Sequence, residues 1–560
     1  MLKNIADILS EPLSYLINSC FKVGHFPNNL KLSRVVPVHK SGSIDDINNF
    51  RPISLVPIVA KVIEGIMYKQ MQAFVESNCI LSKRQYGFIR GQGTINAITD
   101  FMKSGYEALN NGDSLVVKLL DLSKAFDTVS HDILVKKLAW YGFDETAIKC
   151  ISSYLSERLM TVHKGNAYSS LLSLNQGVPQ GSILGPLFFV LYINDLPASL
   201  DFDGVDVYLF ADDLAVQLRN ADSAAVTRCI SVILRAVTTL MESRGLSLAS
   251  EKTELVLLTR RHLPTEVPFS VGAEEIVASR ALKYLWVYLD TKLSFWEQVR
   301  RAVEKAGKIT SALSRLMANV GGPTECRRRL LMTVTNSVLL YGAEVWAGAL
   351  DKGKYRKQKA AVQRRGALRI ASAYRTVSEP AVLVIAGVPP IDLLALERRR
   401  VHRTRREVGV LQAKVAARAA LMESWEERWR RETRGRWTAR LIPSVEEWVS
   451  REWGEVGYYL TQFLSGHGYF RAYLQRMGIV EDAACIYGDS SHDDACHTFF
   501  ECDRWSGERA ALERVLGTWT PERAVAAMCG SRQGWGTVAR YVEGVLKSKK
   551  RDLDRVEGGR

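Results

Sequence analysis

The pattern of hydrophobic and polar positions changes near residue 290. Before that point, helical stretches alternate with short apolar runs rich in β-branched residues, such as residues 114–120, 205–210 and 253–259. Runs of this kind predict strands, and their alternation with helical stretches predicts strands packed against helices. From about residue 291 the pattern is helical and rich in Arg, Ala and Leu. The sequence therefore predicts an α+β part followed by a mainly α-helical part.

Gly and Pro interrupt the helical part at three places, where we expect joints between sub-domains. These are Gly321-Gly322-Pro323, Pro389-Pro390 and Pro443. A Trp- and Arg-rich stretch in this part places Trp425 and Trp429 four residues apart, on one face of a helix. The two side chains fit either a packed amphipathic helix or a surface that stacks on or contacts nucleic acid.

Positive charge is concentrated in one region. The net charge is +15, and residues 351–440 hold 23 Lys and Arg against 9 Asp and Glu, a surplus of 14. Such a surplus attracts a polyanion and lets Lys and Arg displace counterions from phosphates. We therefore expect this region to bind nucleic acid; the alternative is a set of solvated helix faces.

Other bulk properties favour an intracellular protein without a membrane partner. No apolar run approaches the roughly 18 residues that a membrane span needs. The start of the chain resembles an amphipathic helix and not a secretory signal. The chain has nine cysteines, an odd number that cannot all form pairs, and most of them are scattered along the sequence. This does not fit a disulfide framework.

Three carboxylates stand out because of their apolar surroundings. Asp212 and Asp213 lie inside the run YLFADDLAV, and Asp121 directly follows another apolar run. Buried carboxylates are costly unless they are paired, hydrogen-bonded or bound to a metal. If the two strands are neighbours, the three carboxylates meet, and two Mg²⁺ ions would balance their charge. The alternative is that Asp212 caps a turn and Asp213 faces solvent.

A Gly- and Pro-rich stretch, residues 175–196, lies between the two acidic sites. Its three glycines permit close backbone approach and its two prolines fix turns, which places Gln180 well to meet a substrate. Asp127, His131 and Asp132 have a different expected role. We expect them to cap and begin the next helix and not to take part in chemistry.

Ordered motifs along the chain carry a specific resemblance. They are HFPNNLKLSRVVPVHK (25–40), NNFRPISLV (48–56), RQYGFIRG (84–91), DLSKAFDTVSHD (121–132), QGVPQGSILGPLFFVLYINDL (176–196), FADD (210–213) and LASEKTELVLL (248–258). In this order they resemble the reverse transcriptases of non-LTR, LINE-type retrotransposons, over at least residues 25–290. Weaker similarity continues through KYLWVYLD (283–290) and LLYGAEVW (339–346).

The resemblance implies roles for the acids and for five further residues. Asp121 and Asp212 would be the metal-bridging acids, with Asp213 adjacent and more peripheral. The residues implied at the nucleotide are Phe126, which would crowd the sugar 2′ position and select deoxynucleotides; Lys40 and Arg51, which would grip the triphosphate; Gln180; and Lys252, which would protonate the pyrophosphate leaving group. Trp286 departs from the family pattern, which has Gly there, and Gln298 stands near where the family tends to have His.

The implied fold is α+β: a right-hand polymerase with fingers, a ferredoxin-like palm and a helical thumb, followed by a mainly α-helical basic region. The expected divisions are an N-terminal helix (1–17) left from an upstream region, fingers and palm (18–290), thumb (291–350), a basic helical nucleic-acid-binding region (351–480), a degenerate Cys/His knuckle (481–510) and a C-terminal helical tail (511–560).

The knuckle rests on residues 485–505, which resemble a cysteine-histidine element near the C-terminus of these polyproteins. Cys485, His497 and Cys502 match, whereas Gly488 stands where a second cysteine is expected. Cys496 or His492 is the candidate fourth ligand of a zinc ion, since tetrahedral Zn²⁺ accepts either sulfur or nitrogen. The alternative is a degenerate knuckle whose thiols are merely packed.

The expected function is RNA-directed DNA synthesis at a nicked chromosomal target, with template RNA, primer or target DNA and dNTPs as partners and the nucleus as the site of integration. The residues of the motifs and of the knuckle most resemble those of arthropod type-1 elements that insert into ribosomal RNA genes. An endonuclease is expected in the full polyprotein, and nothing in this chain resembles one. The alternatives are a non-catalytic nucleic-acid-binding relic and a host-serving reverse transcriptase of the telomerase or intron-maturase kind.

Overall fold

The computed structural model describes residues 2–220, 223–248, 254–260, 268–271 and 274–557. The chain divides into two compact units, Met1–Ser294 and Phe295–Arg560. The first contains strands and helices, and the described residues of the second form helices. The predicted change of pattern near residue 290 thus falls at the boundary between the units. None of the described helices is long and apolar enough to cross a membrane.

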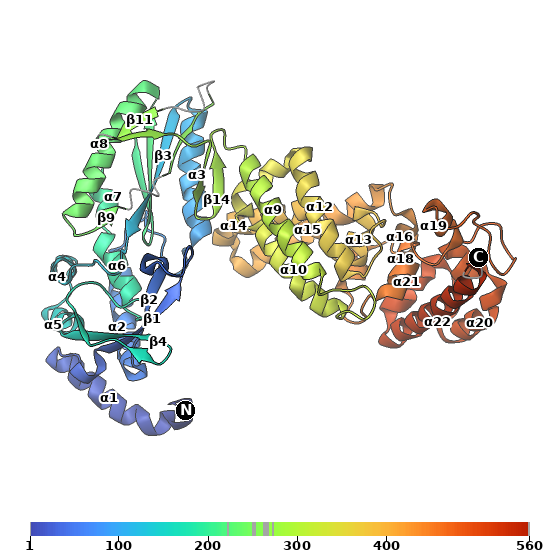
Figure 1. Cartoon of the computed structure of the whole chain (residues 1–560), viewed down its shortest axis with the longest axis horizontal. Helices are drawn as coiled ribbons and strands as arrows, with labels where there is room; N and C mark the ends of the chain where they lie inside the picture. Colours follow the sequence, from blue (N-terminus) through green and yellow to red (C-terminus); the bar gives the residue numbers. More distant parts are fainter. Residues whose placement is uncertain (1, 221–222, 249–253, 261–267, 272–273, 558–560) are drawn as a thin grey trace. The chain divides into compact units, whose positions relative to one another are not determined.

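One antiparallel sheet of the first unit carries the three aspartates. Its order is β10-β3-β8-β7, with β9 also paired to β3. Its strands are β3 (Ser114–Ser123), β7 (Val205–Phe210), β8 (Asp213–Asn220), β9 (Ser247–Leu248) and β10 (Leu255–Leu258). Helix α3 (Thr94–Asn110) lies on one side of this sheet and α8 (Ser223–Glu242) on the other (Figure 1). Because both sides are covered, the central strands appear in the sequence as continuous apolar runs.

A second sheet has the order β2-β1-β4-β5, with β6 also paired to β4. Strands β1 and β4 are parallel, and the other pairs are antiparallel. Its strands are β1 (Leu32–His39), β2 (Phe50–Leu55), β4 (Arg158–Lys164), β5 (Ala167–Tyr168) and β6 (Leu172–Leu174). Two small hairpins, β11–β12 (Pro268–Val271 and Glu274–Val277) and β13–β14 (Ala281–Tyr284 and Val287–Asp290), complete the strands.

The remaining helices of the first unit are α1 (Ala6–Val23), α2 (Ile58–Ser77), α4 (His131–Trp140), α5 (Glu145–Leu155), α6 (Gly185–Ile193) and α7 (Leu196–Ser199). Helix α6 is apolar all round and almost wholly buried, as such a helix must be. Helix α1 packs against α5 and continues past residue 17, where the sequence predicted the end of a separate N-terminal helix. It is therefore part of the first unit.

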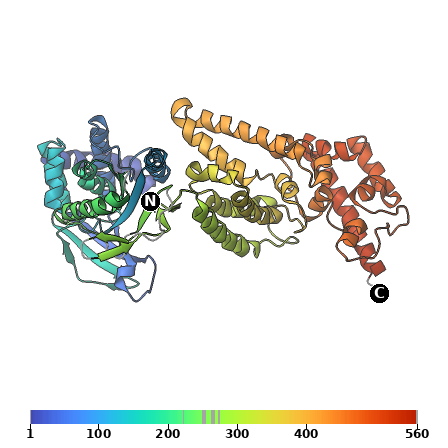
Figure 2. The same cartoon turned by 90° about the horizontal axis from the view of Figure 1, so that it is seen from above.

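The second unit is built from helices around one hydrophobic core. They are α9 (Trp296–Ser314), α10 (Glu325–Leu340), α11 (Ala343–Trp346), α12 (Gly353–Ile370), α13 (Glu379–Ile385), α14 (Ile391–Val408), α15 (Val410–Arg431), α16 (Arg436–Leu441), α17 (Val445–Ser450), α18 (Tyr458–Ser465), α19 (Arg471–Arg476), α20 (Ser506–Leu516), α21 (Pro521–Gly530) and α22 (Arg532–Glu557). The long helices α14 and α15 run side by side (Figure 2). All three predicted Gly/Pro breaks fall between helices.

The core of the second unit extends from Met317 to Leu546 without a break at the predicted boundaries. Those boundaries, at residues 350, 480 and 510, stay predictions. Trp425 and Trp429 belong to this core and are each 2% exposed. Of the two interpretations of this pair, the packed amphipathic helix is therefore the right one.

Candidate functional site

The three aspartates meet at the end of the first sheet. Strand β3 pairs with β8 so that Asp121 lies directly opposite Asp213. Strand β7 pairs with β8 so that Phe210 lies opposite Asp213, which leaves Ala211 and Asp212 as a two-residue turn. The predicted acidic cluster required the strands that carry Asp121 and Asp212 to be neighbours. The pairing of β3 with β8 meets this requirement.

The turn that holds Asp212 is held in place by the segment 84–87. The backbone N–H of Leu209 donates to the carbonyl of Arg84 (2.9 Å), and that of Tyr86 donates to the carbonyl of Leu209 (2.9 Å). Gln85 Oε1 accepts the backbone N–H groups of Tyr86 and Gly87, each at 2.9 Å. Position 87 requires glycine, because a Cβ atom there would lie 2.2 Å from the Ala211 nitrogen. The RQYG motif is thus a clamp on the aspartate turn.

Mutual repulsion and burial raise the pKa values of two of these acids. The pKa of Asp212 is raised by burial and by the charge of Asp121, against the opposing effect of Lys40 and Arg51. Burial and the charges of Asp212 and Asp121 raise the pKa of Asp213 to about 6. Carboxylates in such surroundings are stabilised by a cation, so the donor set fits a divalent metal ion.

A cavity of about 320 Å³ opens beside the acids. Its lining includes Asp121, Asp213, Glu254, Lys283, Tyr284 and Trp286. The Lys283 Nζ atom lies 3.5 Å from the centre of the Trp286 ring, and the charge of Lys283 opposes the rise in the pKa of Asp213. Trp286 has a φ of 70°, which explains why glycine suits this position in the family pattern. Sequence reasoning missed Lys283, although it lies within the quoted KYLWVYLD motif.

Gln180 lies on a loop fixed from two sides. Its carbonyl accepts the backbone N–H of Ser54 (2.7 Å), and its side-chain amide donates to Asp127 Oδ1 (3.1 Å). Gly181 has a φ of 122°, and a Cβ atom there would lie 2.5 Å from the Ser54 carbonyl oxygen. The predicted need for glycine in this stretch is therefore met at Gly181.

The predicted role of Asp127 as a helix cap is wrong. Ser130 caps helix α4, because its Oγ accepts the backbone N–H of Ile133, and Asp127 instead accepts the Gln180 amide. His131 and Asp132 do begin the helix, as predicted. Burial raises the pKa of Asp127.

The other predicted nucleotide residues lie on separate elements of the first unit. The ring of half-buried Phe126 stacks on Phe189, with centroids 4.8 Å apart, and meets the edge of Phe88 at 6.1 Å. Lys40 and Arg51 are exposed, and both act electrostatically on Asp212. Lys252 lies outside the described residues.

Glu64 is a further functional candidate that the sequence did not single out. It is fully buried on α2, where its carboxylate accepts the Tyr154 hydroxyl (2.9 Å) and the backbone N–H of Ile183 (2.7 Å). It thereby fixes the end of the loop that carries Gln180. In the sequence, Glu64 stands between the apolar residues Ile63 and Ile66. An acid in such a position can be buried or exposed, so the pattern alone did not identify Glu64.

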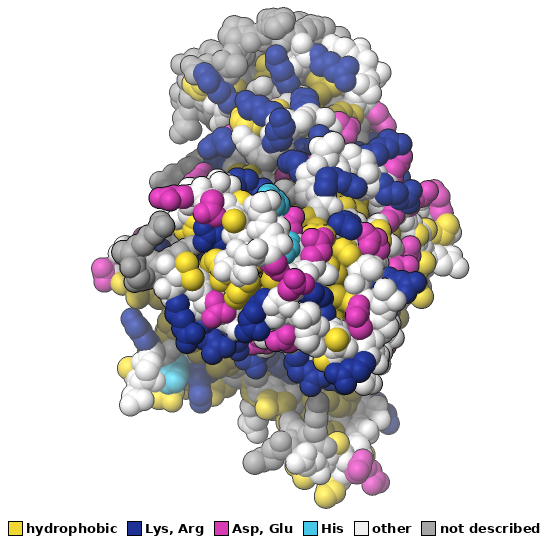
Figure 3. Space-filling model, turned by 90° about the vertical axis from the view of Figure 1, so that its right-hand side faces the viewer, with side chains coloured by type: hydrophobic (Ala, Val, Ile, Leu, Met, Phe, Trp, Pro, Cys, Tyr) yellow, Lys and Arg dark blue, Asp and Glu magenta, His cyan; other side chains and the backbone are white. Residues whose placement is uncertain are grey.

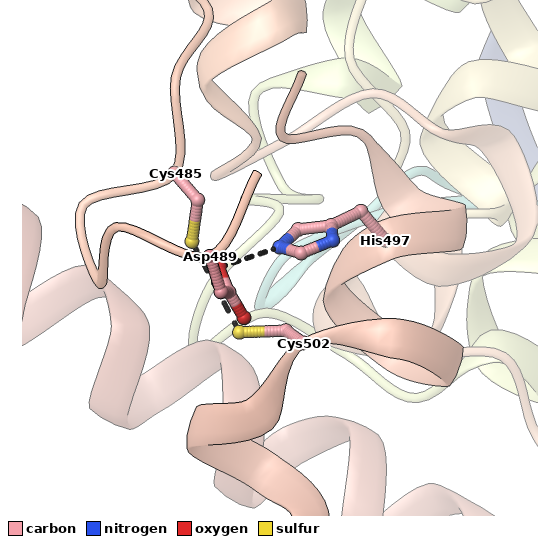
Figure 4. Close-up of side chains that lie close together, drawn as sticks. All are labelled: Cys485, Asp489, His497 and Cys502. Carbon is pink, nitrogen blue, oxygen red and sulfur yellow. Dashed lines mark hydrogen bonds and ion pairs between the residues drawn. The ribbon is translucent and has the colours of Figure 1, made fainter. Parts of the chain in front are cut away.

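A second cluster lies in the predicted knuckle. Cys485, Asp489, His497 and Cys502 point toward one another from a loop and the segment that follows it (Figure 4), and their ligand atoms all lie within 4.8 Å of one another. Among the described residues this is the one group of three or more His, Cys, Asp or Glu side chains placed so that they could hold a metal ion together. The sulfur atoms of Cys485 and Cys502 are 4.0 Å apart.

The fourth member of this cluster is Asp489, which corrects the prediction of Cys496 or His492. The Cys496 sulfur lies near Glu501 Oε1 (3.4 Å) and an Arg440 nitrogen (3.6 Å) instead. Asp489 Oδ1 lies 3.1 Å from His497 Nε2. Burial opposes ionisation of Asp489, but hydrogen bonds from the two thiols and a backbone N–H outweigh it and keep its pKa well below the usual range. Two sulfurs, one imidazole and one carboxylate form a donor set that fits tetrahedral zinc.

Part of the positive charge in the basic region is locally paired. Salt bridges join Arg418 to Glu397, Arg428 to Asp392, Arg430 to Glu426, Arg431 to Glu427 and Arg434 to Glu432. The face shown in Figure 3, on which the C-terminal helices look toward the viewer, carries Lys and Arg mixed with Asp and Glu. Nucleic-acid binding by this region therefore stays a prediction.

Comparison with known proteins agrees with the site. Residues 38–289 match the family model described as reverse transcriptase (RNA-dependent DNA polymerase). This part of the chain resembles the reverse transcriptase domains of non-LTR, LINE-type elements. It contains the aspartate cluster, the clamp at residues 84–87 and the Gln180 loop.

Three relatives illustrate the similarity. The chain is 26% identical to a putative 115 kDa protein in the type-1 retrotransposable element R1DM of Drosophila melanogaster, over 92% of this chain and 52% of that protein. It is 28% identical to the RNA-directed DNA polymerase from mobile element jockey of Drosophila melanogaster, over 60% of this chain and 37% of that protein. It is 28% identical to a Pol polyprotein from a type-1 element R1 of Nasonia vitripennis, over 60% of this chain and 86% of that protein.

The chain matches only part of the two Drosophila proteins. It spans 52% of the length of the R1DM protein and 37% of the length of the jockey polymerase. Among solved structures, telomerase from Candida tropicalis in complex with a fragment of telomeric RNA is similar at 11% identity and a TM-score of 0.36, over 73% of this chain and 68% of that chain. This likeness is too weak to place individual elements.

Proposed function

We propose that this chain is the RNA-directed DNA polymerase part of a non-LTR retrotransposon, which copies element RNA into DNA at a nicked chromosomal target. The observation that carries the proposal is the register of β3 and β8, which sets Asp121 opposite Asp213 beside the Asp212 turn, within a reverse transcriptase domain. The reaction is attack of a primer 3′-hydroxyl on the α-phosphorus of a dNTP, with release of pyrophosphate.

Asp121 and Asp212 are the proposed ligands of two Mg²⁺ ions, with Asp213 at the edge of the site. When bound, the ions supply activation of the attacking hydroxyl and stabilisation of the leaving oxygen. The aspartates would supply the negative charge that attracts the ions and would fix where the ions bind. The raised pKa values of Asp212 and Asp213 are the observation that favours a cation at this place.

The nucleotide contacts follow from charge, shape and position. Lys40 and Arg51, whose charges act on Asp212, would hold the triphosphate, Arg51 through paired hydrogen bonds. Phe126, braced by Phe189, would crowd a ribose 2′-hydroxyl and favour deoxynucleotides. Gln180, held by Asp127, would meet the nucleotide, and Lys252 would protonate the leaving group.

In this proposal the sheet of β3, β7, β8, β9 and β10 is the ferredoxin-like palm, the sheet of β1, β2 and β4 belongs to the fingers, and residues 291–350 form the thumb. Catalysis then depends on positioning and charge neutralisation within the palm. The proposed place of action is the nucleus, at the site of integration.

The structural cluster of Cys485, Asp489, His497 and Cys502 is the proposed zinc site. Zinc would tie together residues 485–502 and lend stability to the fold, as structural zinc does elsewhere. This role is separate from polymerisation.

Primer extension on an RNA template tests the polymerase proposal. The protein is compared with Asp212→Asn and with Asp203→Asn, an exposed aspartate on a loop outside the site. With Mg²⁺, the unmodified chain and Asp203→Asn should make cDNA, and Asp212→Asn should lose at least 99% of the activity. If the unmodified chain binds RNA and makes no cDNA, it is the non-catalytic relic; if Asp212→Asn stays active, the assigned site is wrong.

A further inference from the structure

A cluster of aromatic rings gathers on the second unit. It consists of Tyr374, Tyr458, Tyr459, His467, Tyr469 and Tyr473, and we call it the tyrosine cluster. Neighbouring ring centres are 4.8 Å apart for His467 and Tyr473, 5.3 Å for Tyr458 and Tyr459, and 5.8 Å for Tyr374 and Tyr458. All but Tyr473 are half-buried, so their side chains remain partly accessible to solvent.

The hydroxyl groups of the cluster are bonded to one another. The Tyr374 and Tyr458 hydroxyls are 2.6 Å apart, and those of Tyr458 and Tyr469 are 3.1 Å apart. Thr376 Oγ1 lies 2.8 Å from the Tyr473 hydroxyl. The three half-buried tyrosines Tyr374, Tyr458 and Tyr469 therefore bond their hydroxyl groups within the cluster while their side chains stay partly exposed. The network also fixes the rings before any ligand arrives, which lowers the entropic cost of binding.

Three cations each lie over one face of a ring in the cluster, which leaves the opposite face for a stacked base. The Lys547 Nζ atom lies 5.6 Å from the Tyr459 ring centre, the Lys550 Nζ atom 5.8 Å from that of Tyr469, and the Arg476 guanidinium 5.4 Å from that of Tyr473. Lys547 also pairs with Glu543 at 2.6 Å.

The two lysines are held on this side by their neighbour on α22. Lys549 is buried, and its ion pair with buried Asp493, at 2.5 Å, fixes the rotation of the helix. Lys547 and Lys550, three residues apart, then both face the tyrosine cluster.

We propose that the tyrosine cluster binds unpaired bases of single-stranded nucleic acid. Ordered, partly exposed aromatic rings next to Lys and Arg are the combination with which proteins bind single strands: the bases stack on the rings and the cations meet the phosphates. The cluster contributes rings and cations, and Glu543 pairs with Lys547. The inference deepens the proposed function by naming a second contact for its template or target strand.

Binding of a fluorescent single-stranded RNA of about 20 mixed nucleotides to the full chain tests the proposal. The double variant Tyr459→Leu with Tyr469→Leu keeps apolar volume and removes two ring faces, whereas Tyr459→Phe with Tyr469→Phe keeps the faces. The Leu variant should bind about tenfold more weakly, the size expected for one lost base stack, and the Phe variant within twofold of the unmodified chain. Equal binding by all three overturns the proposal.

Cross-linking to the unmodified chain keeps the proposal testable where the Leu variant folds poorly. RNA and single-stranded DNA carrying 5-iodouracil should each be tried, since cross-links form to aromatic rings stacked on the base. Peptides containing Tyr458, Tyr459 or Tyr469 should be labelled, and the RNA and DNA arms show which strand is preferred. Labelling must persist in Asp212→Asn, which separates this site from polymerisation. Cross-links that fall only in the first unit overturn the proposal.

Discussion

The Gln180 side chain donates a hydrogen bond to Asp127 over 3.1 Å, and this contact joins two segments of the first unit that lie 53 residues apart in the chain. Asp127 follows the strand that delivers Asp121, and Gln180 lies on the loop before α6. The position of a proposed nucleotide contact therefore depends on an acid that does not itself carry out the reaction.

Replacement of Asp127 by Ala should release Gln180 and weaken nucleotide binding. A hydrogen bond to a charged group contributes about 1.5–3 kcal/mol, so we expect the KM for dNTP to rise roughly tenfold with a smaller change in kcat. Steady-state primer extension measures both constants. Asp132→Ala, at an exposed position in the first turn of α4, is the matched control and should leave KM within about twofold. A loss confined to kcat would place Asp127 in a different role.

Glu64 should make stability depend on pH. Burial raises its pKa above the usual 4.5, despite hydrogen bonds from the Ile183 N–H and the Tyr154 hydroxyl. The protonated acid therefore favours the folded state, and this contribution is fully present below about pH 4.5 and is lost as pH rises through the raised pKa. Glu64→Gln cannot ionise and does not lose this contribution. The melting temperature of Glu64→Gln minus that of the unmodified chain should therefore be more positive at pH 8 than at pH 4.

Tyr154→Phe is the control for this comparison, since it removes one hydrogen bond and leaves the carboxylate. Because the Tyr154 hydroxyl stabilises the ionised carboxylate, Tyr154→Phe should lower the melting temperature more at pH 8 than at pH 4, which is the opposite of the trend for Glu64→Gln. A melting-temperature difference for Glu64→Gln that falls with pH would show that the buried carboxylate is favoured in its charged form.

The sequence predicted the parts of the fold that local patterns control. Continuous apolar runs predicted the strands around Asp121 and Asp212, because a strand covered on both sides has few polar positions. Gly181 was predicted as a place of close approach, and a side chain there would meet Ser54.

Contacts between distant segments could not be predicted in the same way. The partner of Asp127, the acceptor role of Glu64 and the fourth member of the knuckle all depend on which loops meet in the fold. At the knuckle, the sequence analysis considered only Cys and His as the fourth zinc ligand and therefore proposed Cys496 or His492. Cys496 directly precedes His497, and adjacent side chains do not easily point at one ion, whereas the loop before them brings Asp489 to His497.

Protons should compete with Mg²⁺ at the aspartate cluster. The pKa of Asp213 is raised to about 6, so its carboxylate loses charge as pH falls toward and below 6, and the raised pKa of Asp212 makes that group protonate at a higher pH than an ordinary aspartate. Because a carboxylate must be ionised to bind metal, the Mg²⁺ concentration for half-maximal primer extension should rise from pH 7.5 to pH 5.5, by up to about tenfold per pH unit. In Asp213→Asn the rise should be shallower. An Mg²⁺ requirement that is the same at both pH values contradicts the assignment.

Zinc content decides between Asp489 and Cys496 as the fourth ligand. Metal analysis of the full chain purified without chelator should find about one zinc per molecule, and Cys496→Ser should keep it, since its sulfur faces Glu501 and Arg440. Asp489→Ala should lose zinc or release it faster to a chelator, because three ligands remain. Asp489→Cys should release it more slowly, because thiolate is the stronger ligand for zinc.

Cobalt provides a readout of geometry that is independent of stability. With Co²⁺ in place of zinc, the unmodified chain and Cys496→Ser should give the same visible absorption of a tetrahedral site with two thiolates, and Asp489→Cys should give a spectrum with three. Loss of the tetrahedral spectrum in Cys496→Ser with retention in Asp489→Ala would restore Cys496 as the ligand. Absence of bound metal in every variant would contradict the zinc proposal and favour the alternative, a degenerate knuckle whose thiols are packed without a metal.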